Sequence, residues 1–425
     1  MNNLLILTSR DFARFANTRI RHLTHHLANL FEETTVVFRC HQVTPSNPWR
    51  SFWRLQLRVY QKERLKLVEV DPLGARPHGL ASRLLKITNP FEQKPPGGKR
   101  LLQEGLSLLG GISDLLLLPS LLLAFRRACA PRYRIILAQG PFEALCGALL
   151  KKWGRAVFLV CDDADYEPGF APTRARRALI RWAEKTGIRR ADLVVSVGHM
   201  LAERRRREYG LKNVVVIPNG VDYSIFSQAQ IKKPSAHYTL LYMGYLGGWS
   251  GLDLLLAALV LLKKEKHPLP RLLLAGHLDP FYFEAWKEKA HKQNISFSYL
   301  GRFPYHKLTV PLEQAVLGWA VFPPIPLRRY AFPLKAVEYM AAGLAVLATK
   351  DTEAGLLINS HQAGYVLPYQ KEIVAETLKN VYRNPEEVES YRRRGAEAAR
   401  QYDWKKILKK YSALIKENFH LNGRP

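Results

Sequence analysis

Cysteine is scarce in this sequence. The 425 residues include four cysteines, at positions 40, 129, 146 and 161. They form no CxxC pair and no metal-ligand spacing, which argues against a disulfide-stapled fold and against a zinc module. We therefore expect buried thiols in a reducing compartment.

Long apolar runs are also missing. The most apolar stretch, residues 101–130, is interrupted by Glu104, Asp114, Pro119 and Arg126, so it falls short of the roughly 20 residues that span a bilayer. The N-terminus has only the short run Leu4–Leu7, unlike a secretory signal. We expect a cytoplasmic protein that lies on the inner face of the cell membrane without crossing it.

Acidic residues are few relative to basic ones. Asp and Glu number 36 against 64 Lys and Arg, a net charge of +28, of which +17 lies before Phe226 and +11 after it. Such a field favours anionic partners, namely lipid headgroups, phosphorylated substrates or nucleic acid. No zinc finger, RRM signature or other reader motif is present, which argues against nucleic acid.

Short apolar strands alternate with helical stretches along the chain, a pattern typical of parallel sheets covered on both faces. The turn Pro218-Asn219-Gly220 and the polar stretch Ser227–Ala236 separate two such series. The pattern predicts an α/β protein with two doubly wound, Rossmann-like domains and a cleft between them. We place the domains at residues 1–226 and 227–400, followed by a helical segment, 401–425.

The stretch FPLKAVEYMAAGLAVLAT, residues 332–349, carries the clearest chemistry. Pro333 starts a helix on which Lys335 and Glu338 lie one turn apart. Free N–H groups at a helix start hold phosphates, and a nearby acid accepts ribose hydroxyls. An ordinary amphipathic helix with a solvated Lys–Glu pair is the alternative interpretation.

This stretch resembles the nucleotide-sugar segment of glycosyltransferase family four. IPNGVD (217–222), YMGYLGGWSGLDLLLAAL (242–259) and LGRFPY (300–305) resemble other stretches of that family, in the same order. The resemblance implies the two-domain GT-B fold, with the last helices packing back on the N-terminal domain. It also implies sugar transfer from a nucleoside diphosphate to a lipid-linked or envelope glycan, without cofactor or metal and with retention.

The resemblance also assigns site residues. Glu338 matches the ribose-binding glutamate, and Lys335 with the neighbouring backbone of Pro333 and Leu334 would face the diphosphate. The glycine loop that lets the donor phosphates approach the chain is represented by Gly244, Gly247 and Gly248.

Three positions depart from the family pattern. Tyr330 replaces a glutamate that contacts the donor sugar, while Tyr245 and Ser250 replace an arginine and a lysine that bind the diphosphate. We expect the missing positive charge to come from the group Arg302, Arg328, Arg329 and Lys335. A nucleotide-sugar-binding protein that has lost catalysis is the alternative function.

A second set of candidates follows the predicted strand Ala156–Cys161. Asp162, Asp163 and Asp165 would face the ligand cleft, and their mutual repulsion could raise one pKa to make a general base. A helix N-cap or a solvated loop is the alternative, and metal binding a lesser one. Asp162 and Asp165 match a D-x-x-D pattern of the family; if the reaction is retaining, Asp165 orients the acceptor or the sugar.

Three further residues are assigned to the acceptor. Gln139 and Gly140 follow the predicted strand Arg134–Ala138, and Arg19 occupies a position where the family often has an arginine, which suggests an acceptor phosphate.

Cations gather on three segments of the first half: a helix with Arg174, Arg177, Arg181, Lys185 and Arg189, the run Arg204–Arg207, and the mixed aromatic stretch Trp49–Arg54. Such segments are typical of anionic membrane surfaces, although a solvated charged face is the alternative for each one.

Overall fold

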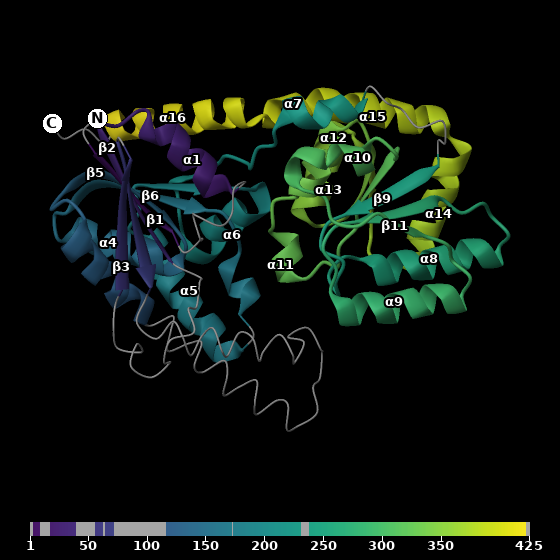
Figure 1. Cartoon of the computed structure of the whole chain (residues 1–425), viewed down its shortest axis with the longest axis horizontal. Helices are drawn as coiled ribbons and strands as arrows, with labels where there is room; N and C mark the ends of the chain where they lie inside the picture. Colours follow the sequence, from purple (N-terminus) through teal and green to yellow (C-terminus); the bar gives the residue numbers. More distant parts are fainter. Residues whose placement is uncertain are drawn as a thin grey trace. The chain divides into compact units, whose positions relative to one another are not determined.

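The computed structural model describes residues 3–8, 18–39, 56–62, 64–71, 116–171, 173–230 and 238–421, which form two compact units (Figure 1). The first comprises the described residues up to Ile217 and those from Leu408 onward, and the second spans Pro218–Ile407. The division precedes the expected boundary at residue 226 because Val221 and Phe226 are buried in the core of the second unit.

The first unit is built on an eight-stranded sheet. Its order is β3 (Gln56–Lys62), β4 (Leu65–Asp71), β2 (Glu33–Arg39), β1 (Asn3–Thr8), β5 (Tyr133–Gln139), β6 (Ala156–Asp163), β7 (Leu193–Ser196) and β8 (Val214–Val216). All neighbours are parallel except β3, which pairs antiparallel with β4. We did not predict β3, because this edge strand exposes Arg58, Val59, Tyr60 and Gln61 in succession and shows no apolar alternation.

Helices cover both faces of this sheet. Phe158 of β6 packs edge-on against Phe419 of α16 (Trp404–Leu421), with ring centroids 5.8 Å apart. The next residue, Leu159, belongs to the core under α4 (Pro141–Lys152) and α5 (Arg174–Ile188) on the opposite face. Successive strand residues point to opposite faces, which is why β6 is apolar throughout. The other helical segments are α1 (Arg19–Ala28), residues 116–128, η1 (Glu167–Phe170) and α6 (His199–Tyr209).

The second unit has a six-stranded, all-parallel sheet. Its order is β11 (Ser298–Tyr299), β10 (Arg271–Ala275), β9 (Thr239–Met243), β12 (Leu317–Ala320), β13 (Ala345–Thr349) and β14 (Gly364–Leu367). The strand order reverses between β9 and β12, and doubly wound sheets bind ligands beside such a switch point.

The helices of the second unit are α7 (Tyr223–Phe226), α8 (Leu252–Lys264), α9 (Pro280–Lys292), α10 (Thr309–Leu312), α11 (Pro326–Arg329), α12 (Leu334–Ala341), α13 (Glu353–His361), α14 (Lys371–Arg383) and α15 (Pro385–Ala399). Short 3-10 turns occur at η2 (Ser227–Gln230), η3 (Tyr305–Lys307) and η4 (Arg400–Tyr402). The expected linker therefore begins with an ordered turn, in which Ala229 is buried, and residues 231–236 lie outside the described residues.

The prediction of two doubly wound α/β units is confirmed. The fully buried runs Leu4–Leu7 and Leu272–Ala275 have the continuous apolar character of parallel strands covered on both faces. Within the described ranges, no helix is both long enough and apolar enough to cross a membrane.

Candidate functional site

The switch point of the second unit brings together the predicted donor residues. The loop after β9 carries Gly244, Gly247 and Gly248, and the chain after β12 passes through α11 to the first turn of α12. Leu334 is the first residue of α12 and Pro333 its N-cap. The glycine loop thus lies at the carboxyl end of β9, and the chain leading to α12 leaves the carboxyl end of the adjacent strand β12.

Glu338 is 7% exposed, on the second turn of α12. Burial raises the pKa of its carboxyl to about 7, although the charge of Lys335 acts in the opposite direction. Burial also lowers the pKa of Lys335, an effect that Glu338 opposes and Arg328 reinforces. A buried glutamate does not fit the alternative of a solvated Lys–Glu pair.

The glycine loop packs closely against these side chains. A methyl group on Gly244 would lie 2.2 Å from Cε of Lys335, and one on Gly247 would lie 2.3 Å from the ring of Tyr245. At Gly248, by contrast, a methyl group would meet no protein atom within 4 Å. Sequence reasoning missed Gly276, directly after β10, where φ is +128° and a methyl would lie 1.9 Å from the carbonyl oxygen of Gly244.

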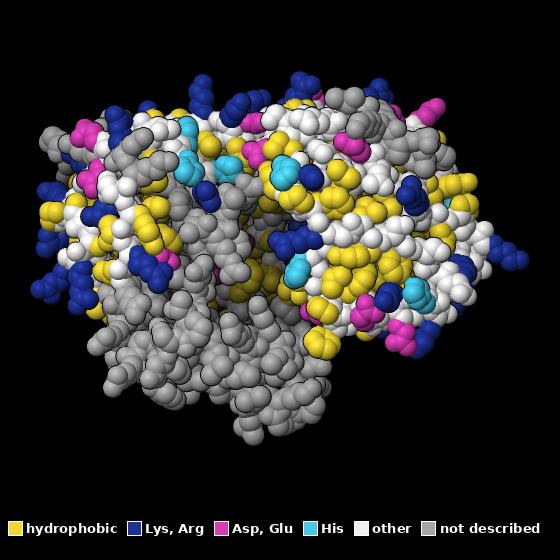
Figure 2. Space-filling model, in the orientation of Figure 1, with side chains coloured by type: hydrophobic (Ala, Val, Ile, Leu, Met, Phe, Trp, Pro, Cys, Tyr) yellow, Lys and Arg dark blue, Asp and Glu magenta, His cyan; other side chains and the backbone are white. Residues whose placement is uncertain are grey.

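The departures from the family pattern occupy the same region. Tyr245 stacks on Trp249, Ser250 is fully buried, and Tyr330 is buried at the end of α11. Arg302 and Arg329 are exposed, whereas Arg328 is half-buried and lies over aromatic rings. Figure 2 shows Lys and Arg side chains gathered where Figure 1 places α11.

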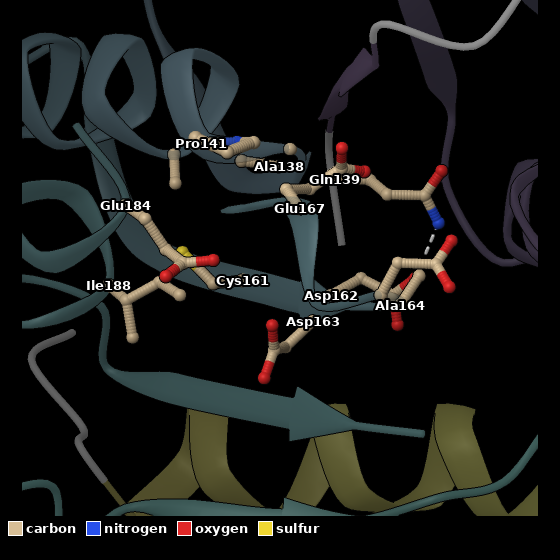
Figure 3. A pocket seen from close by; sticks show the side chains of 13 residues that line it. Ala138, Gln139, Pro141, Cys161, Asp162, Asp163, Ala164, Glu167, Glu184 and Ile188 are labelled. Carbon is tan, nitrogen blue, oxygen red and sulfur yellow. Dashed lines mark hydrogen bonds between the residues drawn. The ribbon is translucent and has the colours of Figure 1, made fainter. Parts of the chain in front are cut away.

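In the first unit, Asp162 at the end of β6 is enclosed by partners. Nε of Arg19 donates to both carboxylate oxygens, at 2.9 and 3.0 Å, and the amide of Gln139 donates to one at 2.7 Å (dashed in Figure 3). The hydroxyl of Tyr411, from α16, donates at 3.2 Å, and its ring lies beneath the Arg19 guanidinium.

Asp163 points away from Asp162 in Figure 3, as strand alternation requires. It accepts hydrogen bonds from Ser196 at 2.6 Å and from Arg205 at 2.9 and 3.0 Å. Arg205 also binds Glu184, so this fully buried guanidinium bridges two carboxylates.

These contacts change the interpretation of the acidic cluster. Asp162 and Asp163 are neutralised by separate arginines on opposite faces of the sheet, so they do not form a mutually repelling trio with Asp165. Because Arg19 is 7% exposed and engaged by Asp162, it is not presented to an acceptor phosphate. Gln139 likewise points at Asp162.

Asp165 remains as the candidate for acceptor chemistry. It is half-buried and lines a small hollow with a volume of about 20 Å³, together with Gln139, Gly140 and Glu167. Within the described residues, no group of three or more His, Cys, Asp or Glu is arranged to hold a metal ion.

Sequence reasoning missed the partners of the buried acids. Arg205 belongs to the run Arg204–Arg207, which we interpreted as exposed. Arg204 pairs with Glu208 and stacks on Tyr166, so this run is mainly structural. The position of Glu184, the one acidic residue on the basic helix α5, could have indicated a buried partner. Nothing in the sequence around Tyr411 indicates its contact with Asp162. The stretch Trp49–Arg54 lies outside the described residues.

Comparisons with known proteins place this geometry in a family. Residues 16–220 match the family model described as glycosyl transferase 4-like domain, and residues 225–401 match that described as glycosyl transferases group 1. The chain is a family-four-like glycosyltransferase. The resemblance in the glycine loop and α12 is therefore confirmed at the level of the family.

Solved structures show that this glycosyltransferase has the GT-B fold. It is similar to sucrose-phosphate synthase from Thermosynechococcus elongatus, with 16% identity over 99% of this chain and 100% of the other, and a TM-score of 0.69. HepE from Anabaena in complex with UDP matches with 14% identity, coverage of 98% and 100%, and a TM-score of 0.65. WaaG, involved in lipopolysaccharide biosynthesis, matches with 14% identity, coverage of 98% and 99%, and a TM-score of 0.58. No curated protein matches the sequence.

Proposed function

We propose that this glycosyltransferase binds a nucleoside diphosphate sugar in its second unit and transfers the sugar to a lipid-linked or envelope glycan. The single observation that carries the proposal is the packing of Lys335 against the bare backbone of Gly244, one helical turn before the buried Glu338. Lys335 and the start of α12 offer positive charge to a diphosphate, and Glu338 offers carboxylate oxygens to ribose hydroxyls. HepE, a structural neighbour, was solved with UDP.

The chemistry follows from the charges at this site. Transfer breaks the bond between the anomeric carbon and the diphosphate oxygen and forms a bond to the acceptor oxygen. Cations around the diphosphate stabilise the charge that develops on the leaving group, so we propose a reaction without metal or cofactor. In a retaining, front-side reaction the departing diphosphate takes the proton of the acceptor hydroxyl, and Asp165 orients the acceptor.

The acceptor proposal includes an anionic membrane surface, on the inner face of the cell membrane. Helix α5 exposes Arg174, Arg177, Arg181 and Lys185 along one stripe, while its opposite side is buried against α4. Trp182 on α5 is 54% exposed, and Phe170, which precedes the start of α5, is 52% exposed. Cations beside exposed aromatic rings favour the interface of an anionic bilayer. WaaG, which acts in lipopolysaccharide biosynthesis, supports an envelope acceptor by analogy.

A thermal-shift screen across UDP, GDP, ADP and TDP sugars tests the proposal. A ligand present at 100 times its Kd stabilises the native state by about 2.7 kcal/mol, so one nucleotide series should raise the Tm clearly. E338A and K335A should abolish the shift while retaining the unliganded fold. If no nucleotide sugar raises the Tm, or if E338A responds like the parent protein, the donor site is elsewhere.

A further inference from the structure

The arginine expected after the first glycine of the donor loop is replaced by Tyr245. Its ring stacks on Trp249, with centroids 5.0 Å apart and planes 26° from parallel, and its hydroxyl donates to Asp279 at 3.0 Å. Tyr245 is thus held in place at both ends, one by a ring and one by a carboxylate. It cannot supply positive charge, but it fixes the position of Trp249.

Arg328 of α11 lies over the ring of Trp249 and over that of Phe322, which follows β12. The carbon at the centre of its guanidinium is 4.8 Å from the ring centroid of Phe322 and 5.7 Å from that of Trp249. Aromatic faces attract a guanidinium and support it in a defined orientation. We call Tyr245, Trp249 and Phe322 the ring platform.

The charge of Arg328 reaches the donor loop. It lowers the pKa of Lys335, and it acts on Tyr242, whose hydroxyl lies 3.1 Å from where a methyl group on Gly244 would be. Lys335 of α12 thus packs against Gly244, and the charge of Arg328 on α11 acts on Lys335. Like charges at a partly desolvated site repel each other, and an anion with several oxygens between them would remove the repulsion.

We propose that Arg328 binds the donor diphosphate and replaces the cation that position 245 lacks. The ring platform holds the guanidinium of Arg328 in its orientation. The inference rests on the proposed donor site and names the residue that gives it diphosphate specificity. A guanidinium offers paired N–H donors to phosphate oxygens, which a lysine does not. Arg302 and Arg329 are exposed, whereas Arg328 is half-buried and its guanidinium lies over two aromatic rings.

Calorimetry with inorganic pyrophosphate and with UDP, GDP, ADP and TDP tests the assignment. We expect R328Q to weaken pyrophosphate binding by about 10- to 100-fold, the scale of a lost hydrogen bond between charged groups. R328K should recover part of the loss. R394Q is the matched control. The guanidinium of Arg394 also lies over an aromatic ring, 5.0 Å from the centroid of Tyr391, but this residue is on α15. It should bind as the parent protein does.

The outcomes separate this inference from the proposed function. If a nucleotide binds but R328Q binds it as well as the parent protein does, the inference is overturned and the donor site stands. An equal loss in R329Q would show that only the net charge of α11 matters, which also overturns it. If pyrophosphate binding depends on Arg328 but no nucleotide binds more tightly than pyrophosphate, the inference stands and the nucleotide-sugar proposal fails. Binding of neither ligand overturns both.

A charge swap gives a second, independent measurement. Y245R in the R328Q background returns a guanidinium to the loop position that the family uses. We expect the double variant to bind pyrophosphate at least tenfold more tightly than R328Q does. The melting temperature of each variant reports whether the protein is folded. A folded double variant that recovers nothing would contradict the exchange of roles between positions 245 and 328.

Discussion

Gly244 and Lys335 lie so close together that a methyl group on the glycine would come within 2.2 Å of Cε of the lysine. The clash involves the far end of a flexible side chain, so G244A should fold but move the ammonium group. We expect about a tenfold loss of nucleotide affinity, the scale of one charge-assisted contact, with a small change in Tm. Calorimetry and thermal denaturation measure the two quantities.

G248A is the informative comparison, because a methyl group there meets no protein atom within 4 Å. Any loss of affinity in G248A would report the approach of a ligand to the backbone rather than a displaced side chain. If G244A binds nucleotide like the parent protein, Lys335 is not a diphosphate ligand.

The raised pKa of Glu338 makes the stability of the protein depend on pH. Between the ordinary value of 4.5 and about 7 the folded state retains a proton that the unfolded state has released, so stability falls as the pH rises through this window. E338Q removes the free-energy cost of ionising this buried carboxyl group. We expect it to be more stable than the parent protein above pH 7, by up to about 3 kcal/mol, and equal to it near pH 4.5.

Urea denaturation at both pH values measures the difference, while calorimetry should show that the more stable E338Q has lost nucleotide affinity. A variant that is less stable at pH 8 would mean that Glu338 has a structural partner in place of a ligand.

Substitution of Asp165 tests which group accepts the proton of the acceptor hydroxyl. If the leaving diphosphate accepts the acceptor proton, D165N should lower kcat by less than about tenfold, because the residue only orients a substrate. A lost general base would cost about a hundredfold or more. Donor turnover with a glycan acceptor, followed by product analysis, discriminates between the two, and the larger loss would refute the base-free mechanism.

Arg205 should be a determinant of stability. Removing its guanidinium leaves Asp163 and Glu184 buried without their cation, and a broken buried ion pair costs about 3–5 kcal/mol. R207A, an exposed neighbour on α6, should change stability by less than about 0.5 kcal/mol. Chemical denaturation of both variants checks the prediction, and equal stabilities would contradict a role for this ion network.

The membrane proposal predicts salt-sensitive binding to anionic vesicles but not to neutral ones. Each basic residue near an anionic surface contributes about 1 kcal/mol, so neutralising Arg174, Arg177 and Lys185 together should reduce partitioning on the order of 100-fold. Neutralising Lys287, Lys289 and Lys292 on α9, of which the last two are exposed, is the control of equal charge. Co-sedimentation measures both, and equal losses would indicate general charge attraction without a surface on α5.

The sequence predicts those parts of the structure that depend on local pattern. The apolar run at the N-terminus predicts a strand over Asn3–Thr8, and β1 has these bounds. Likewise α12 follows Pro333, because a proline determines its start locally. The sequence pattern also predicts a strand over Trp319–Phe322, whereas β12 spans Leu317–Ala320, since its bounds are defined by pairing with β9 and β13.

The buried ion pairs were not predictable for a related reason. Asp162 bonds to Arg19, 143 positions earlier, and to Tyr411, 249 positions later, and no spacing rule links such distant positions. Within the run Arg204–Arg207, only the packing of α6 against its neighbours selects Arg205 for burial. Composition correctly indicates a basic chain, but it does not tell which cations are exposed.

Helix α16 has a consequence for how this protein is made. Its residues from Leu408 onward belong to the first unit, where Phe419 covers Phe158 and Tyr411 binds Asp162. On the ribosome, the strands of the first unit emerge long before this helix, so Phe158 lacks the cover of Phe419 and the Arg19–Asp162 pair lacks Tyr411 until α16 has been made. A nascent chain that stops after residue 217 should therefore depend on chaperones.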